Sequence, residues 1–175
     1  MDITLSLVHK AKNGDKEAYG ALYSEIYKDL YRFAYYTLGN REDAEDAVSE
    51  AFLEGFRGLK NLRDDKLFKA WMMRIISIRC KRKIKHYVST RQNIDPEDIS
   101  DHVISFDLNT DNDERLSLLS ALSTIDHSER TILILAVVEG YKTREIAEIL
   151  GCPQGTVSSK LYRTLKKLRT ELERR

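Results

Sequence analysis

Residues that break helices and residues that cross-link small folds are scarce in this chain. Its 175 residues include two prolines, eight glycines and two cysteines. Cys80 and Cys152 fall within expected helical segments, and neither belongs to a CxxC pattern or lies near a histidine cluster. We therefore expect no disulfide framework and no metal site, and we interpret both cysteines as packing residues.

Long apolar runs are absent as well. The first residues, MDITLSLVHK, lack a basic start followed by an apolar core, and no apolar run reaches the roughly 20 residues that cross a bilayer. These features predict a cytoplasmic protein without membrane insertion. The sequence also lacks an HExxH motif, a glycine-rich phosphate loop and a nucleophile motif, so we expect neither an enzyme nor a bound cofactor.

Charge is balanced in total but is sorted along the chain. The 29 Lys and Arg residues nearly cancel the 28 Asp and Glu residues, which leaves a net charge of +1. Residues 79–91 carry six basic residues and no acid, whereas the following stretch to Glu114 carries eight acids and no base. That acidic stretch lacks helical periodicity, and its Pro, Asn, Ser and Asp content predicts a flexible linker.

Apolar residues recur at helical spacing nearly everywhere else, and no alternating run predicts a strand. We therefore expect an all-α fold. Two small helical domains, residues 1–88 and 114–175, are predicted on either side of an acidic linker at residues 89–113.

Local capping signals set the expected ends of several helices. Asp15 is a candidate N-cap, and Gly39 favours the left-handed turn that ends a helix. Asp126 and Glu129 form an expected capping box. The expected helices cover residues 15–38, 43–58, 68–86, 126–139, 143–150 and 153 to near the C-terminus.

The strongest local signal is the segment KTREIAEILGCPQGTVSSKLYRTLKKLR at residues 142–169. A short amphipathic helix, a glycine-containing turn and a longer basic helix are typical of a helix-turn-helix, whose second helix enters the DNA major groove. The expected core stripe of the second helix is Val157, Leu161, Leu165, Leu168 and Leu172. Another side carries Ser159, Tyr162, Arg163 and Lys166, which suit base edges and phosphates. The alternative is a solvated basic helix without a ligand.

Two earlier helices carry charge of opposite sign. In residues 68–86 basic residues stand close to aromatic ones, which suits a partly single-stranded nucleic acid, although Trp71 fits a core position equally well. The helix before it has an acidic stripe opposite an apolar side: Asp43, Asp46, Glu50 and Glu54 against Ala44, Val48, Ala51, Phe52 and Phe56. The stripe is either a solvated face or a docking surface for a basic protein.

Three segments match the patterns of a known family. DAEDAVSEAFLEGFRGL at 43–59 resembles the DAEDxxQExFL segment of sigma factor region 2.2, and FKAWMMRI at 68–75 resembles the FxxWLxRI start of region 2.3. Residues 129–169 are similar to region 4, with its pattern EGxSxxEIAxxLGxPxGTVKSRLxRAxxxLR. The chain thus resembles the extracytoplasmic-function (ECF) group of the sigma-70 family. That resemblance implies a region 2 domain, a region 4 domain and no third domain.

The resemblance also implies partners and site residues. The implied partners are core RNA polymerase, through its β′ clamp helices and β flap, promoter DNA, and an anti-sigma protein. Polymerase binding falls on Asp43, Asp46, Ser49 and Glu50. Recognition and melting of the −10 element fall on a loop and on the basic helix: Asn61, Leu62, Arg63, Asp64, Asp65, Lys66, Trp71, Arg74, Arg79 and Arg82. Reading of the −35 element falls on Thr156, Ser158, Ser159, Lys160, Tyr162, Arg163 and Lys166.

Several positions depart from the family pattern. Ser49 stands where Gln is usual, Ile78 and Arg82 stand where Asn and Asp are usual, and Ser158 replaces a frequent Lys or Arg. These departures leave the class intact and bear on which promoter sequence is read. The residues alone also leave open an ordinary helix-turn-helix regulator, which would bind its operator without polymerase.

Overall fold

The computed structural model describes residues 3–92 and 113–173, and all regular structure in these ranges is helical. The predicted all-α class is therefore confirmed. The helices are α1 (Ile3–Lys12), α2 (Lys16–Leu38), α3 (Arg41–Gly58), α4 (Phe68–Gln92), α5 (Asp113–Ser123), α6 (His127–Leu133), α7 (Thr143–Leu150) and α8 (Gln154–Glu173). Two short 3₁₀ turns, Leu59–Asn61 and Asp65–Leu67, join α3 to α4, and a π-helical turn, Ile134–Val138, extends α6.

Capping residues fix the ends of α2 and the start of α3. The Asp15 carboxylate accepts a hydrogen bond of 3.0 Å from the Ala18 N–H, as expected for an N-cap. Gly39, with φ at 76°, ends α2 as predicted. The Asn40 side chain then accepts a hydrogen bond from the Asp43 N–H. Because Asn40 is the cap, α3 begins at residue 41, before its predicted start.

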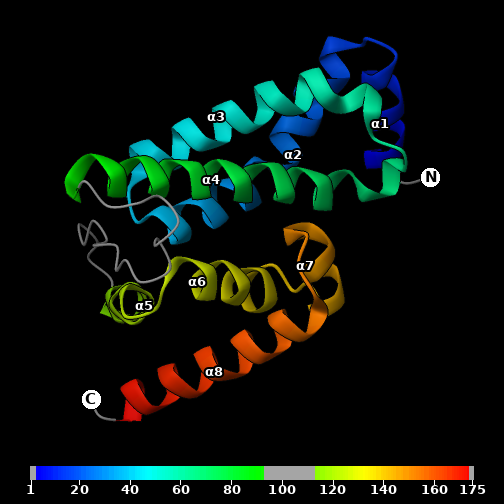
Figure 1. Cartoon of the computed structure of the whole chain (residues 1–175). Coiled ribbons are helices and arrows are strands. Elements are labelled where there is room, and N and C mark those ends of the chain that lie inside the picture. The colour runs from blue at the N-terminus through cyan, green and yellow to red at the C-terminus, as the bar shows by residue number, and fades with distance from the viewer. Residues whose placement is uncertain (1–2, 93–112, 174–175) are drawn as a thin grey trace.

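Helices α2, α3 and α4 pack against one another and form the first bundle, with α1 at one of its ends (Figure 1). Its core contains Leu22 and Phe33 of α2, Val48 of α3 and Met72 of α4, which are all fully buried. The sequence pattern did not predict α1. This helix joins the core through the buried side chain of Val8.

Helix α4 is longer than predicted. It continues past His86 to Gln92, so the first residues of the predicted linker are helical. Lys and Arg are good helix formers, and a change from apolar to basic composition does not end a helix without Gly or Pro. The rest of the linker, residues 93–112, lies outside the described residues.

Helices α5 to α8 form the second bundle. Helix α6 begins with the predicted capping box, in which the Glu129 N–H donates to Asp126 Oδ1 at 2.8 Å and the Asp126 N–H donates to Glu129 Oε2 at 3.2 Å. The predicted single helix to Glu139 instead changes into the π-helical turn at Ile134. Gly140, with φ at 75°, follows this turn.

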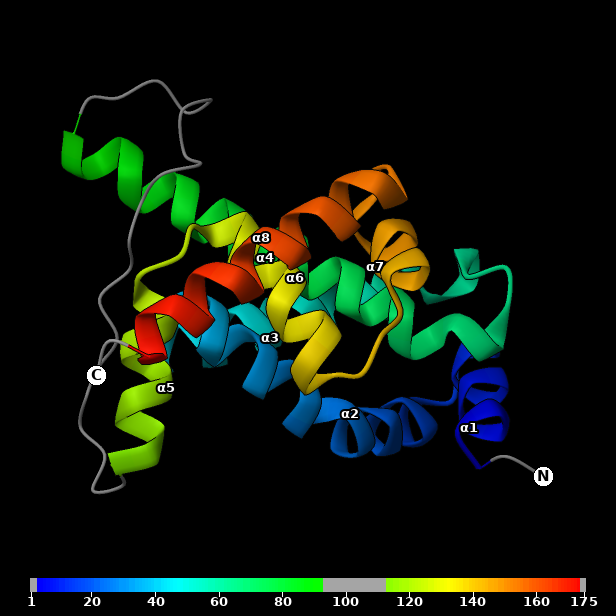
Figure 2. The same cartoon turned by 90° about the horizontal axis from the view of Figure 1, so that it is seen from below.

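The two bundles are in contact. Helix α4 lies against α7, and α2 lies against α6 and the π-helical turn (Figures 1 and 2). Arg130 of α6 is fully buried and donates a hydrogen bond of 3.1 Å to the Thr37 carbonyl of α2. Arg32 of α2 pairs with Glu139 at 2.8 Å, and the Glu139 side chain is only 1% exposed. These contacts close the bundles onto each other.

Three residues differ from their predicted environment. Phe56 of α3 and Leu165 of α8 were assigned to core stripes, yet they are 47% and 45% exposed. Each lies at the edge of an apolar stripe that is wider than the contact made with the neighbouring helices. Cys152 lies half-buried in the turn between α7 and α8 rather than in a helix.

Candidate polymerase and nucleic-acid surfaces

The helix-turn-helix predicted at residues 142–169 is formed by α7 and α8. Gly151, with φ at 66°, ends α7 in the left-handed conformation, and the Cys152 N–H donates to the Ala147 carbonyl at 3.1 Å. Ile146 of α7 and Val157 of α8 are fully buried in the same core. The two helices are therefore fixed relative to each other, with the outer side of α8 left open.

The open side of α8 carries most of the residues predicted to read duplex DNA. Tyr162 is the most exposed large hydrophobic residue among those described, at 70%. The other exposed members are Thr156, Ser158, Ser159, Arg163 and Lys166. Lys160 differs, because it is half-buried and donates a short hydrogen bond to Ser128 Oγ at the start of α6. Helix α8 lies on the side of the second bundle that faces away from α3 and α4 (Figure 1).

The acidic stripe of α3 lies beside the basic residues of α4 and is partly paired with them. Arg79 bridges Glu50 at 3.1 Å and Glu54 at 2.5 Å. The hydrogen bond to Glu54 and the attraction of both carboxylates raise the pKa of the Arg79 guanidinium. Arg79, predicted to contact DNA, is thus held by Glu50, which was predicted to contact polymerase.

Of the remaining stripe residues, Asp43 is also paired with α4, whereas Asp46 is largely open. Lys83 lies 3.5 Å from Asp43 and 3.4 Å from Asp46, and the Tyr87 hydroxyl donates to Asp43 at 2.7 Å. The Asp46 side chain is nevertheless 70% exposed, and Ser49 is exposed. Asp46 and Ser49 are therefore the predicted polymerase contacts that stand most open to a partner.

The loop between α3 and α4 presents most of its predicted residues outward. Asn61, Arg63, Asp64 and Lys66 are exposed. Leu62 is different, because its side chain is buried in the core of the first bundle. Leu62 therefore anchors the loop to the core, and its side chain is not available to a DNA base in this arrangement.

Trp71 of α4 is half-buried beside the loop. A Cβ atom at Gly58 would lie 3.2 Å from the Trp71 ring, which explains the glycine at this close approach. The Phe68 and Trp71 rings lie 6.3 Å apart. Arg74 and Arg82, the other predicted contacts on α4, are exposed. Trp71 therefore packs against the core and still leaves part of its ring at the surface.

Comparisons with known families agree with this geometry. The family model of sigma-70 region 2 matches residues 22–92, and the model of sigma-70 region 4 matches residues 115–168. The chain belongs to the sigma-70 family. As an ECF sigma factor, it serves promoter-specific transcription initiation by RNA polymerase.

Curated relatives of this sigma factor include members of the ECF group. It is 25% identical to the ECF RNA polymerase sigma-E factor of Haemophilus influenzae, over 96% of this chain and 94% of the relative. It is 27% identical to SigW of Bacillus subtilis, with 94% of each chain covered. Its identity to SigE of Mycolicibacterium smegmatis is 33%, over 82% of this chain and 57% of that protein.

Two solved structures have a similar fold. CnrH, solved in complex with the cytosolic domain of CnrY, gives a TM-score of 0.73 at 22% identity and covers 98% of both chains. The sigma factor RpoE of Bartonella quintana, solved with the anti-sigma factor NepR, gives 0.68 at 21% identity over 88% of this chain and 96% of that one. The arrangement of helices in this sigma factor is therefore shared with proteins of low sequence identity.

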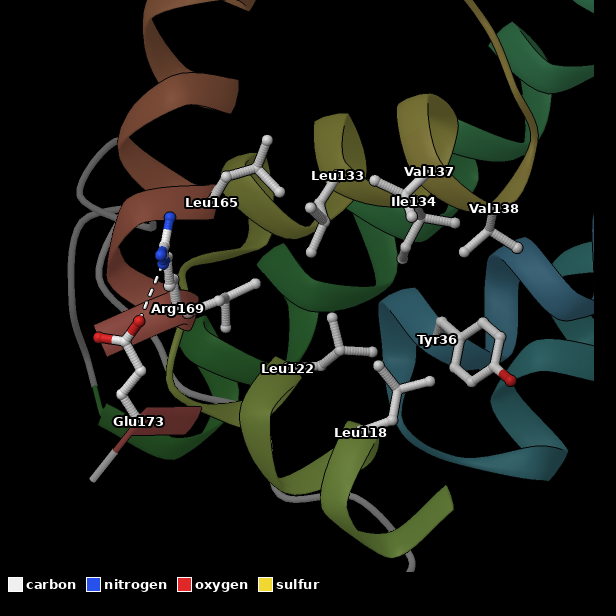
Figure 3. A pocket seen from close by; sticks show the side chains of 11 residues that line it. Tyr36, Leu118, Leu122, Leu133, Ile134, Val137, Val138, Leu165, Arg169 and Glu173 are labelled. Atoms are coloured by element: carbon white, nitrogen blue, oxygen red, sulfur yellow. Dashed lines mark hydrogen bonds and ion pairs between the residues drawn. The ribbon is translucent and has the colours of Figure 1, made fainter. Parts of the chain in front are cut away.

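An open apolar groove in this sigma factor was not predicted. It has a volume of about 480 Å³ and lies between α5, α8 and the π-helical turn (Figure 3). Its lining is almost wholly apolar: Tyr36, Leu118, Leu122, Leu133, Ile134, Val137, Val138, Leu165 and Leu168, with Arg169 and Glu173 at one end. Because these residues come from four separated segments, no single stretch of sequence signals the groove.

The buried polar cluster between the bundles was also missed. Burial lowers the pKa of Arg130 to about 10, and the guanidinium is held by backbone carbonyls. Nearby, burial and the Arg130 charge lower the pKa of His127 to about 4. Nothing in the local sequence separates these residues from surface ones. Within the described ranges no group of side chains is suited to hold a metal ion, and no helix is long and apolar enough to span a membrane.

Proposed function

We propose that this sigma factor reads duplex −35 DNA with α8 and captures unpaired −10 bases with the 61–66 loop and α4. The acidic stripe of α3 and the second bundle hold core polymerase, through its β′ clamp helices and β flap. The domain division is 1–88, 89–113 and 114–175. The observation that carries the proposal is Tyr162, a large aromatic side chain that is 70% exposed among polar and basic neighbours on α8.

The chemistry of the open side of α8 supports the −35 assignment. An arginine such as Arg163 donates to guanine edges, a tyrosine such as Tyr162 contacts thymine methyl groups, and hydroxyl groups and lysines hold phosphates. These groups do not take part in the core, because the fully buried positions of α8 are occupied by Val157 and Thr164. A single exposed aromatic residue is ordinary on a protein surface, so the support comes from Tyr162 standing beside arginine, lysine and hydroxyl side chains on one face of α8.

The exposed loop and the adjoining face of α4 support capture of −10 bases. Each flipped base costs a few kcal/mol of lost stacking, which contacts in the loop and stacking on an aromatic ring must offset. Trp71 leaves part of its ring at the surface, and Arg74 provides charge for the phosphate backbone. Opening of the duplex is thus driven by binding, without any bond being made or broken.

The closed arrangement of the bundles does not suit simultaneous promoter contacts. The Arg74 guanidinium lies 3.7 Å from the position of a Cβ at Gly151, so the −10 helix and the helix-turn-helix touch. The two promoter elements are about 25 base pairs apart, which is roughly 85 Å along a duplex that rises 3.4 Å per base pair. The bundles therefore separate when polymerase and promoter are bound.

An anti-sigma protein is the proposed negative regulator. The groove of Figure 3 is open and apolar, as a site for the apolar face of a partner helix has to be. It is lined by both bundles, because Tyr36 belongs to α2 and the other residues belong to α5, α6 with its π-helical extension, and α8. A helix bound there would hold the two bundles together. It would thereby prevent the separation that α4 and α8 need in order to contact both promoter elements on polymerase.

Run-off transcription with reconstituted core polymerase tests the proposal. The double variant Tyr162→Ala and Arg163→Ala is expected to lose about 1 to 3 kcal/mol per base contact, with polymerase binding unchanged. Arg169→Ala, which also removes an exposed arginine from α8, is the matched control. Equal transcription from the double variant and the wild type would remove the −35 assignment. A gel shift with and without core enzyme adds a second test, since tight binding by the isolated protein would indicate an ordinary regulator.

A further inference from the structure

A lysine of α1 holds the loop that is proposed to capture −10 bases. Lys12 Nζ donates to the Leu62 carbonyl at 2.7 Å and to Asp65 Oδ1 at 2.7 Å. The Lys12 and Asp65 side chains are 23% and 24% exposed, so the contact is shielded from much of the solvent. Helix α1 and the α3–α4 connection lie at the same end of the first bundle (Figures 1 and 2). Helix α1 precedes the segment matched by the region 2 family model, which begins at residue 22.

The loop has little local structure to hold it in place. Its two 3₁₀ turns are single turns, closed by hydrogen bonds of 3.1 Å from the Leu62 N–H to the Leu59 carbonyl and 3.0 Å from the Leu67 N–H to the Asp64 carbonyl. Short 3₁₀ segments have poor hydrogen-bond geometry and are easily rearranged. The Asp64 carboxylate adds one bond within the loop, because it accepts from the Lys66 N–H at 3.0 Å. Each of these bonds spans three residues or fewer, so the position of the loop on the bundle depends on contacts from outside it.

Lys12 supplies such a contact at two points of the loop. Its acceptors, on Leu62 and Asp65, lie on either side of Arg63 and Asp64, whose side chains are exposed. Below the loop, Leu59 and Leu62 are buried in the core. The backbone is thus held from beneath by apolar packing and from the side by one ammonium group, while the tip is free to meet a ligand.

The same bond controls the charge of the loop. An unpaired Asp65 carboxylate next to a DNA strand would repel its phosphates. Because Asp65 is paired with Lys12, its charge is compensated and its side chain is turned toward α1. Lys12 uses two of its three N–H donors on the protein and is turned toward the loop backbone and Asp65, which favours a positioning role over a phosphate contact.

We propose that Lys12 is a positioning residue for base recognition at the −10 element. It keeps the 61–66 loop in a preformed shape, so that binding a flipped base does not have to order the loop first. This inference rests on the proposed function and adds to it a specificity role for α1.

The test compares holoenzymes containing wild type, Lys12→Ala, Lys12→Arg or the control Lys10→Ala on promoters with each base at each −10 position. Lys10 is an exposed lysine of the same helix. Lys12→Ala is expected to reduce the preference for the best base over the others by roughly two- to tenfold, the effect of losing one ordering interaction. Lys12→Arg keeps the charge and is expected to restore part of the preference, while Lys10→Ala leaves it unchanged.

Two further measurements separate positioning from other roles. Asp65→Asn, which weakens the same bond from its other side, is expected to lower base preference in the same direction, and the two changes combined are expected to be less than additive. The slope of the logarithm of the promoter-binding constant of the holoenzyme against the logarithm of the salt concentration is expected to stay at the wild-type value. A slope reduced by about one would mean a direct phosphate contact by Lys12 and would overturn the inference.

Uniform loss of rate at every base would also overturn it, because a merely structural residue lowers all rates alike. If Lys12→Ala does not fold, as judged by circular dichroism, Asp65→Asn alone decides the result. Failure of the proposed function is recognised separately, by wild-type protein that supports no initiation with core polymerase or shows no base preference at the −10 element. That result would remove both proposals.

Discussion

Arg130 and Thr37 lie 93 positions apart in the chain and are joined by a hydrogen bond of 3.1 Å, from Nη1 of the arginine to the carbonyl oxygen of the threonine. The same guanidinium donates to the Leu122 and Ile125 carbonyls, each at 3.0 Å. One buried cation thus serves backbone acceptors of both bundles. Such a residue stabilises the closed arrangement as long as all of its acceptors are in place.

Replacing Arg130 is expected to destabilise the protein strongly. Arg130→Met keeps an apolar stem but removes every donor, which leaves three backbone carbonyls with fewer partners and costs about 2 to 4 kcal/mol of unfolding free energy. Urea denaturation followed by circular dichroism measures the loss. Arg144→Met is the control, because Arg144 is 81% exposed and pairs with Glu148 on its own helix. Its expected effect is below about 0.5 kcal/mol, and equal losses from the two variants would contradict the prediction.

Stability is expected to fall in mild acid because of His127. Burial and the nearby Arg130 charge lower the pKa of its imidazole to about 4 in the folded protein, with further repulsion from Lys81 and Lys160 and an opposing attraction from Asp126. The unfolded chain has a histidine pKa near 6.5. Between these values the unfolded state binds more protons, so unfolding free energy is lost as pH falls from about 6.5 toward 4, by at most about 1.4 kcal/mol per pH unit. Above this window the group has no effect.

Urea denaturation across this pH range measures the slope, which His127→Gln is expected to reduce. His9→Gln removes an exposed histidine of α1 and is expected to keep the wild-type slope. If His127→Gln and wild type show the same pH dependence, His127 is not the group responsible.

Replacing either of two glycines on neighbouring helices by alanine is expected to change the unfolding free energy in opposite directions. At Gly55 of α3 a Cβ would lie 2.7 Å from Met72 Sδ and 2.8 Å from the Tyr19 hydroxyl oxygen, which is bonded to the Phe52 carbonyl. Gly55→Ala is therefore expected to cost about 1 to 3 kcal/mol. At Gly20 of α2 a Cβ would meet nothing within 4 Å.

Gly20→Ala is expected to stabilise by about 0.5 to 1 kcal/mol, because alanine restricts the unfolded chain and favours the helix. Thermal unfolding of the two variants under one set of conditions gives the comparison. A lower melting temperature for Gly20→Ala than for Gly55→Ala would be the contrary outcome.

Asp46 is expected to matter for polymerase binding more than its neighbour Glu45. Both are exposed on α3, but Asp46 belongs to the acidic stripe and Glu45 does not. Asp46→Lys places a positive charge where a basic partner is proposed to dock, which is expected to weaken binding about tenfold or more. Glu45→Lys makes the same charge change outside the stripe. Fluorescence anisotropy of labelled protein titrated with core enzyme measures both, and equal weakening would argue against the stripe as the docking surface.

The helical class, the caps and the helix-turn-helix could be predicted from sequence because each depends on residues three or four positions apart. Asp15, Gly39 and the Asp126–Glu129 box have the predicted roles, and α7 has the predicted bounds. The predicted end of α4 at residue 86 was wrong, because strong helix formers continue the helix to Gln92 without a stop signal. Helix α1 was missed because it is short and has few buried residues.

The candidate surfaces were predicted as sets of residues, but their pairing was not. The sequence separates an acidic helix from a basic one, yet it does not reveal that Arg79 is held between Glu50 and Glu54. Nor does it reveal that Lys12 reaches a loop 50 positions away. A charge in a sequence has a sign and a helical position, while its partner depends on which helices meet.

The sequence by itself therefore determined the helical class, most of the helices with several of their ends, and which faces carry each charge, because these are local properties of the chain. Only the tertiary structure decided that Arg130 is buried at Thr37, that Lys12 bonds to Leu62 and Asp65, and that Phe56 and Leu165 remain exposed. These features depend on the packing of helices far apart in the chain, which removes water from some side chains and leaves chemically similar ones in solvent.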